Sequence, residues 1–195
     1  GTQAVVEMLK RNIWIWTCSG FYRKALLDDY DVWFPVGCTG GEDIEFTLKA
    51  VFHSRSLVSV PKTMSHYVQR PKEGSLGSDT VRRRQIDSLA ANYRVMKYFE
   101  QRGAEQELMG IVESYVMGWI FPGTVASLAS GGDCSLPELL TLVEEYSAGE
   151  HHISYANDFS WIPSWKRRTK ATVGNWLLRL SPTLFCLIAR VLKSV

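Results

Sequence analysis

At Gly40-Gly41-Glu42-Asp43-Ile44-Glu45-Phe46 two glycines stand directly before two adjacent carboxylates. The apolar residues that follow have the spacing of one helix face, at Ile44, Leu48, Val51 and Phe52. This spacing predicts a helix of about three turns that begins at the acids. Carboxylates are favoured at a helix N-terminus by roughly 0.3–1 kcal/mol each, because the exposed N–H groups there carry partial positive charge. The stretch therefore indicates either a plain helix start or an ionised general base held at a glycine-lined corner.

The composition indicates a chain that buries a core of its own and has no dominant nucleic-acid surface. Its 195 residues carry 22 Lys and Arg against 20 Asp and Glu, and a net charge of +2 argues against a nucleic-acid partner. Four cysteines are scattered without a CxxC spacing, at Cys18, Cys38, Cys134 and Cys186. Scattered cysteines favour free thiols in a reducing compartment over a disulfide framework or a zinc site, so we expect a cytoplasmic protein.

The pattern of apolar residues changes near residue 80, where we expect a domain boundary between 1–80 and 81–195. Before it, runs of β-prone residues predict strands at 13–18, 57–60 and 63–68. After it, helical spacing predicts a long helix from 81 that ends near Gly103 and a second over 105–121. A third begins at Ser135-Leu136-Pro137-Glu138, which has the form of a capping box, and runs to about 148.

The order of features over residues 12–78 resembles a known enzyme family. A strand at 14–19, the segment 21–27, Phe34, Glu42-Asp43 and the apolar helix are followed by two strands that end in His66-Tyr67-Val68-Gln69-Arg70, with Ser75 beyond. This order resembles the C-terminal half of a GT-A glycosyltransferase, most like the bacterial family 2 enzymes. The resemblance implies an α/β fold, the C-terminal part of a GT-A domain, followed by a mainly helical extension.

The resemblance also implies an inverting transfer reaction. A sugar would pass from a nucleotide-sugar donor to a glycan, lipid-linked or cell-envelope acceptor, as in polysaccharide biosynthesis. By resemblance Asp43 is the general base that takes the proton from the acceptor hydroxyl, and Glu42 binds the acceptor or orients the base. Gly40 and Gly41 would let a sugar ring approach the backbone closely.

Further candidate substrate-binding residues lie on both sides of the acids. Trp33 could stack on a sugar face, although a core tryptophan is an equal alternative. Arg70 and Lys72 could meet the donor diphosphate, and Ser75 lies beside them; the alternative is a solvated loop.

A divalent metal, Mg²⁺ or Mn²⁺, is expected from the family, with most of its ligands in an upstream half. His66 is a candidate ligand or an exposed histidine at the end of a strand. The Asp-x-Asp form at 29–31 is interpreted as a surface turn. The family's nucleotide-binding half has no counterpart in these residues, so we expect a fragment, or a relic of such an enzyme, that is incomplete and inactive alone.

The C-terminal segment 166–195 begins with the basic cluster Lys166-Arg167-Arg168-Thr169-Lys170 and continues as an apolar stretch. Arg179, Pro182 and Arg190 interrupt that stretch, which makes it a poor spanning helix of about 20 residues. Two interpretations remain: a helix on the anionic inner face of the cell membrane, or a helix packed on its own core. The rival to an enzyme is a non-catalytic helical interaction or membrane-associated module, in which Glu42-Asp43 only caps a helix.

Overall fold

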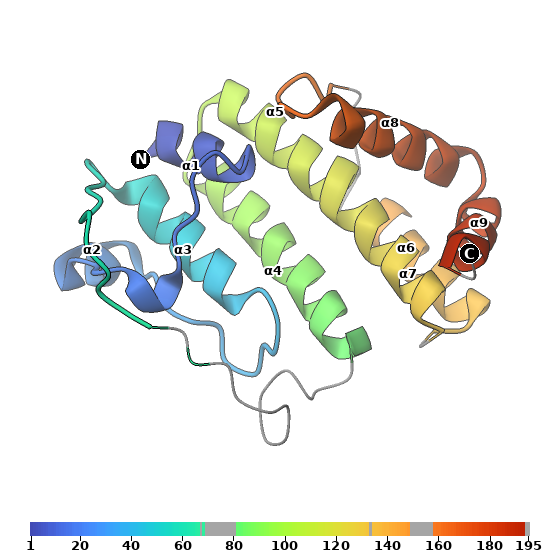
Figure 1. Ribbon diagram of the computed structural model, residues 1–195, viewed down its shortest axis with the longest axis horizontal. Helices are drawn as coiled ribbons and strands as arrows, with labels where there is room; N and C mark the ends of the chain where they lie inside the picture. The colour runs from blue at the N-terminus through green and yellow to red at the C-terminus, as the bar shows by residue number, and fades with distance from the viewer. Residues whose placement is uncertain (67, 69–80, 133, 149–157, 194–195) are drawn as a thin grey trace. The chain divides into compact units, whose positions relative to one another are not determined.

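The computed structural model describes residues 1–66, 68, 81–132, 134–148 and 158–193 (Figure 1). The chain forms two compact units, one from Gly1 to Ala104 and the other from Glu105 to Val195. In the described part of the chain the regular elements are all helices. The domain boundary predicted near residue 80 lies at the start of α4. This helix belongs to the first unit, which ends at Ala104.

The predicted α/β architecture, the C-terminal part of a GT-A fold, is wrong: the residues that the structure describes contain no strand. Segments 13–16 and 57–60 are irregular backbone, as are the described residues of 63–68, and Thr17–Ser19 is a short 3-10 helix, η1. A strand is stable only within a ladder, and none of these segments is paired in one. Most of their apolar residues therefore stay exposed, with Val58 at 86% of its full accessibility.

Helix α3, Glu42–His53, is the central element of the first unit. It contacts α1 (Thr2–Leu9), α2 (Lys24–Tyr30), η1 and α4 (Val81–Gln101). The helix predicted from the Gly-Gly-Glu-Asp stretch is confirmed, and so is the long helix predicted from residue 81. Both were readable from local spacing, because helix hydrogen bonds join residues four positions apart.

Aromatic rings hold α3 to its neighbours. The ring of Phe46 lies between Tyr22, edge-on at 5.0 Å between centroids, and Phe34, stacked at 4.3 Å. At the end of the helix Phe52 stacks on Phe99 of α4 at 4.6 Å. These contacts fix both the start and the end of α3 within the unit.

The second unit is built around one continuous helix, Gln106–Gly131. It consists of α5 (Gln106–Tyr115), a π-helical turn η3 (Val116–Ile120) and α6 (Phe121–Gly131). One row of buried residues repeats every four positions, with a step of five across the π turn: Leu108, Val112, Val116, Phe121, Val125 and Ala129. By length and composition alone the helix could cross a membrane, and 56% of its apolar window is buried within the structure.

Three further helices of the described chain pack on this core helix: α7 (Leu136–Ala148), α8 (Trp165–Leu180) and α9 (Pro182–Lys193). The predicted capping box before α7 is confirmed. The Ser135 N–H donates to Glu138 Oε2 at 2.8 Å, and the Glu138 N–H donates to Ser135 Oγ at 3.4 Å. The basic and apolar C-terminal segment forms α8 and α9, which pack against each other.

Candidate functional site: the acidic start of helix α3

The two glycines before α3 let the chain lie directly on α4. A Cβ added at Gly40 would lie 2.4 Å from the backbone oxygen of Arg84, and one at Gly41 would lie 2.9 Å from Ser88 Cα. Gly41 also has φ +81°, a left-handed conformation that side chains disfavour. The structure thus gives both glycines a packing role, whereas their approach to a sugar ring stays a prediction.

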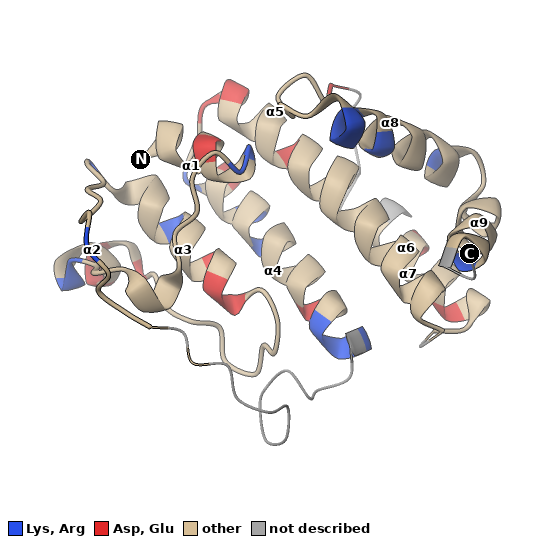
Figure 2. Cartoon of the chain, viewed as in Figure 1, with Lys and Arg blue, Asp and Glu red and all other residues tan. Residues whose placement is uncertain are grey.

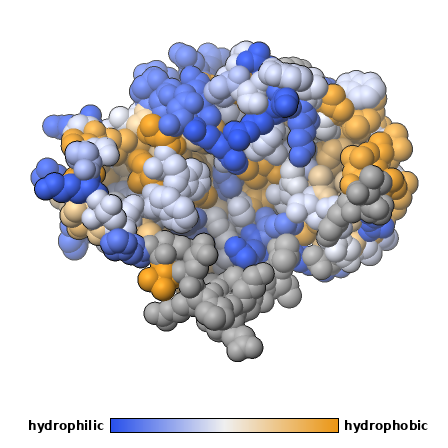
Figure 3. Space-filling model, in the orientation of Figure 1, coloured by the Kyte–Doolittle hydropathy of each residue, from blue (hydrophilic) through white to orange (hydrophobic). Residues whose placement is uncertain are grey.

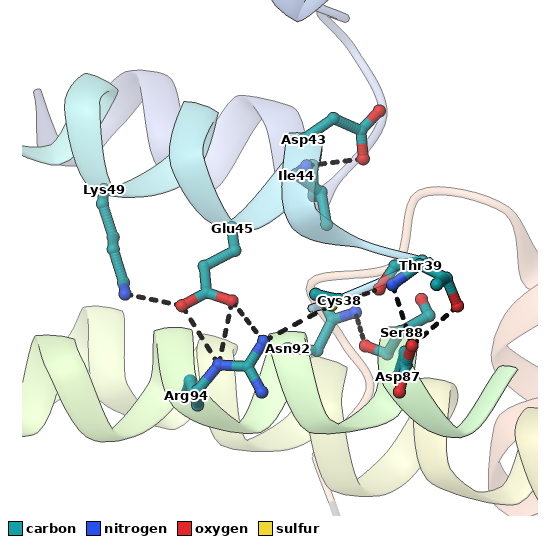
Figure 4. A network of polar contacts seen from close by, with 11 residues as sticks. Cys38, Thr39, Asp43, Ile44, Glu45, Lys49, Asp87, Ser88, Asn92 and Arg94 are labelled. Carbon is teal, nitrogen blue, oxygen red and sulfur yellow. Dashed lines mark hydrogen bonds and ion pairs between the residues drawn. The ribbon is translucent and has the colours of Figure 1, made fainter. Parts of the chain in front are cut away.

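The loop before α3 is also tied to α4 by hydrogen bonds (Figure 4). The N–H and the hydroxyl of Thr39 both donate to Asp87 Oδ2, at 2.8 and 2.7 Å. Partial burial would raise the pKa of Asp87, but the two Thr39 hydrogen bonds, with Arg83 and Arg94 nearby, outweigh burial and lower that pKa. An ionised Asp87 is therefore the form that holds the loop.

Glu45, an acid whose role the sequence did not predict, is buried and forms an ion pair with the partly exposed Arg94 (Figure 4). Glu45 is only 2% exposed, and its carboxylate accepts hydrogen bonds from Arg94 Nε at 3.0 Å and Nη2 at 2.7 Å. Lys49 Nζ lies 2.7 Å from the other carboxylate oxygen. The hydrogen bond to Glu45 raises the pKa of Arg94. The one local signal was the spacing of four residues between Glu45 and Lys49.

Asp43 is exposed and makes no ion pair with the described residues. Its Oδ1 accepts a hydrogen bond from the N–H of Ile44 at 2.7 Å, and Figure 4 shows the carboxylate directed away from α4. The backbone at this point is held from η1, because the Thr17 hydroxyl donates to the Asp43 carbonyl at 3.2 Å and lies 2.7 Å from the Thr47 hydroxyl. A carboxylate on a fixed backbone, with one oxygen to which no described residue donates a hydrogen bond, is able to accept a proton from a ligand.

Glu42 is half-buried, and its Oε2 is enclosed without a hydrogen-bond partner among the described residues. Enclosed polar atoms in proteins nearly always have a partner, because an unpaired one costs the desolvation free energy of the group. A donor supplied by a ligand would satisfy this oxygen. The unpartnered oxygen and the exposed Asp43 carboxylate therefore make the start of α3 the candidate site.

The remaining predicted site residues are not brought to this corner by any contact in the described structure. Trp33 is half-exposed and His66 is exposed, and no group of three metal-ligating side chains is found among the described residues. Arg70, Lys72 and Ser75 lie outside the described residues. Their predicted roles stay predictions.

At the other end of α3 lies an aromatic cluster that the sequence did not predict. His53 stacks on Tyr30 at 3.7 Å between ring centroids, and its Nε2 lies 2.8 Å from the hydroxyl of Tyr98. Arg102 lies over the ring of Tyr98 at 5.0 Å and donates to the Tyr30 carbonyl at 3.2 Å. Burial, with a smaller contribution from Arg102, lowers the pKa of His53, so the neutral ring is the form that fits here.

Comparison of the chain with protein-family models, with curated proteins and with solved structures gives no match. The resemblance to glycosyltransferases therefore depends only on the order of the quoted residues, since the strands expected within that order are not found among the described residues.

Proposed function

We propose that this chain contributes the acceptor-side carboxylates of a glycosyltransferase, with Asp43 as the general base. The observation that carries the proposal is the different environment of the acids in the first turn of α3. Glu45 is neutralised by Arg94 and Lys49, whereas Asp43 is exposed and has no cationic partner among the described residues. The enclosed Oε2 of Glu42 carries a desolvation cost that a hydrogen-bond donor from a ligand would offset, and the exposed Asp43 beside it is accessible to the same ligand.

The proposed reaction assigns one proton transfer to this chain. An acceptor hydroxyl donates a hydrogen bond to Asp43, and its oxygen attacks the anomeric carbon of the donor sugar. The new carbon–oxygen bond forms as the bond from that carbon to the nucleotide diphosphate breaks, and the hydroxyl proton passes to Asp43. Glu42 Oε2 would accept a hydrogen bond from a second acceptor hydroxyl and orient the sugar. Mg²⁺ or Mn²⁺ is expected from the family, but no step is assigned to it because the described residues bring no metal-ligating group together.

The test uses the protein as its cell makes it, with any further sequence or subunit that accompanies these residues. Sugar incorporation from labelled UDP- and GDP-sugars into glycan and lipid-linked acceptors is measured for the wild type, Asp43→Asn and Glu42→Gln. Asp43→Asn should reduce the rate by about 10²–10⁴-fold, and Glu42→Gln by less. Asp29→Asn, a change of another exposed acid, is the matched control and should leave the rate unchanged.

Two results would overturn the proposal. One is incorporation by Asp43→Asn above roughly a tenth of the wild-type rate, since loss of a general base costs far more. The other is a wild type that transfers none of the sugars. After either result the carboxylates would be interpreted only as caps of α3, and the chain as the non-catalytic module of the rival hypothesis.

A further inference from the structure

Helices α8 and α9 carry charge of one sign. Residues 165–193 contain seven basic residues and no Asp or Glu: Lys166, Arg167, Arg168, Lys170, Arg179, Arg190 and Lys193. Figure 2 shows the basic residues along α8. In the sequence of the second unit all nine acids precede residue 159 and all seven bases follow residue 165, so the unit has a basic C-terminal segment that can attract an anionic surface although its net charge is slightly negative.

Two of these cations have a structural role. Arg168 Nη2 donates to the carbonyls of Ser160 at 3.2 Å and Ile162 at 2.9 Å, and Arg190 Nη2 donates to the carbonyl of Cys134 at 2.9 Å. The side chains of Lys166, Arg167 and Lys170 are exposed near the start of α8, and Lys166 Nζ lies 5.8 Å from the centroid of the exposed Trp165 ring. These three are in position to meet a ligand surface.

The outward side of the same two helices is apolar. On α8 the inward side consists of Ala171, Asn175 and Leu178, which are buried. The opposite side carries exposed apolar residues at helical spacing: Trp165, Val173, Trp176 and Leu180. On α9 the exposed apolar residues are Leu184, Leu187, Val191 and Leu192. Figure 3 shows hydrophobic atoms gathered at the surface near α9.

We propose that α8 and α9 bind the surface of an anionic lipid bilayer. A bilayer surface matches both properties at once, because its headgroups meet the lysines and arginines while its acyl boundary buries the apolar side. Trp176, which is 58% exposed, and Trp165 are of the residue type that sits at the membrane–water boundary. This proposal does not depend on glycosyl transfer, and either can fail without the other.

The test is co-sedimentation of the whole chain with vesicles of phosphatidylcholine alone or with about one third phosphatidylserine, at about 50 and 500 mM salt. We expect binding that needs the anionic lipid and weakens at high salt. Lys166→Gln/Arg167→Gln/Lys170→Gln should weaken binding on the order of 10²-fold, at about fivefold for each cation. Leu184→Ser/Leu187→Ser/Val191→Ser should also weaken binding. The factor by which it does so should be the same at both salt concentrations, because salt does not screen apolar burial.

The matched control for the basic residues is Lys24→Gln/Arg55→Gln/Lys62→Gln, three exposed cations of the first unit with the same change in net charge. Its binding should stay within about twofold of the wild type. Equal binding to neutral and anionic vesicles would overturn the proposal, and so would an equal loss in this control. Pelleting or self-association without vesicles would show that another protein copy, and not lipid, covers the apolar side. The lipid and salt dependence of the wild type decides the matter even if a variant fails to fold.

Discussion

The buried contact of Glu45 with Arg94 offers a quantitative test of how α3 is held on α4. Arg94→Met removes the guanidinium but keeps an apolar stem. Two charge-assisted hydrogen bonds of 3.0 and 2.7 Å are lost, and a hydrogen bond to a charged group contributes about 1.5–3 kcal/mol. The Arg94 side chain is 43% exposed, and Lys49 still neutralises Glu45, so we expect a loss of about 2 kcal/mol in the free energy of unfolding. This is below the roughly 3–5 kcal/mol of a fully buried pair that loses one partner.

Glu45→Leu should cost a similar amount, about 2 kcal/mol, because Arg94 can reach water but Lys49, whose side chain is only 15% exposed, loses its carboxylate partner. The double variant should cost little more than Glu45→Leu alone, which gives a coupling free energy of about 1.5–2 kcal/mol. Urea unfolding of all variants, followed by circular dichroism and tryptophan fluorescence, measures these values. The two probes together resolve whether the units unfold separately.

The matched control is the exposed pair of Lys97 and Glu100, whose charged atoms lie 2.9 Å apart on α4. Lys97→Met with Glu100→Leu should show a coupling below about 0.5 kcal/mol, because water screens an exposed pair. The cations of the two pairs are similarly exposed, and only the acids differ, with Glu45 at 3% and Glu100 at 58%. Equal couplings would therefore show that burial of the Glu45 carboxylate is not the source of the strength assigned to this pair.

Two further predictions concern the ends of α3. The pKa of His53 is lower in the folded chain than in the unfolded chain, so as the pH falls the unfolded chain is protonated at the higher pH. The contribution of the neutral ring to the free energy of unfolding is therefore complete above pH 6.5 and decreases as the pH falls from there toward the folded-state pKa. His53→Phe should abolish this loss in urea midpoints between about pH 7 and 5, whereas His66→Gln, at an exposed position, should retain it. Gly41→Ala should destabilise by about 2–4 kcal/mol, since it combines a left-handed φ with a clash. Gly37→Ala, with φ +78° in open space, should cost only about 1 kcal/mol, and equal losses would contradict the packing role of Gly41.

Local sequence patterns were sufficient to predict those elements whose stabilising contacts join residues close together in the chain. The start of α3 at Glu42 and the capping box at Ser135 and Glu138 follow from residues within a turn of one another, and the structure contains both. The expected strands failed for the opposite reason. A β-prone run such as 57–60 specifies residues that suit a sheet, but the sheet needs a second strand that the run itself does not encode.

The candidate site was predictable only in part for the same reason. The position of Asp43 at a helix start could be read from the sequence, but the fate of Glu45 depends on Arg94, which lies 49 residues further along the chain. Likewise, the two glycines suggested an open corner for a ligand, whereas the atoms that face them belong to Arg84 and Ser88 on α4. Long-range partners of this kind leave no periodic signal.

The π turn of the second unit determines where its core helix can tolerate the deletion of a residue. The step of five between Val116 and Phe121 is the single irregular interval in the buried row from Leu108 to Ala129. A π turn takes one residue more than an α turn, so loss of Trp119 or Ile120 would convert it into an α turn and leave α5 and α6 in their present orientations. Loss of a residue within α5 or α6 would instead rotate all later side chains by about 100° and turn the row out of the core. The turn is thus the point where this helix can lose a residue and keep its alignment.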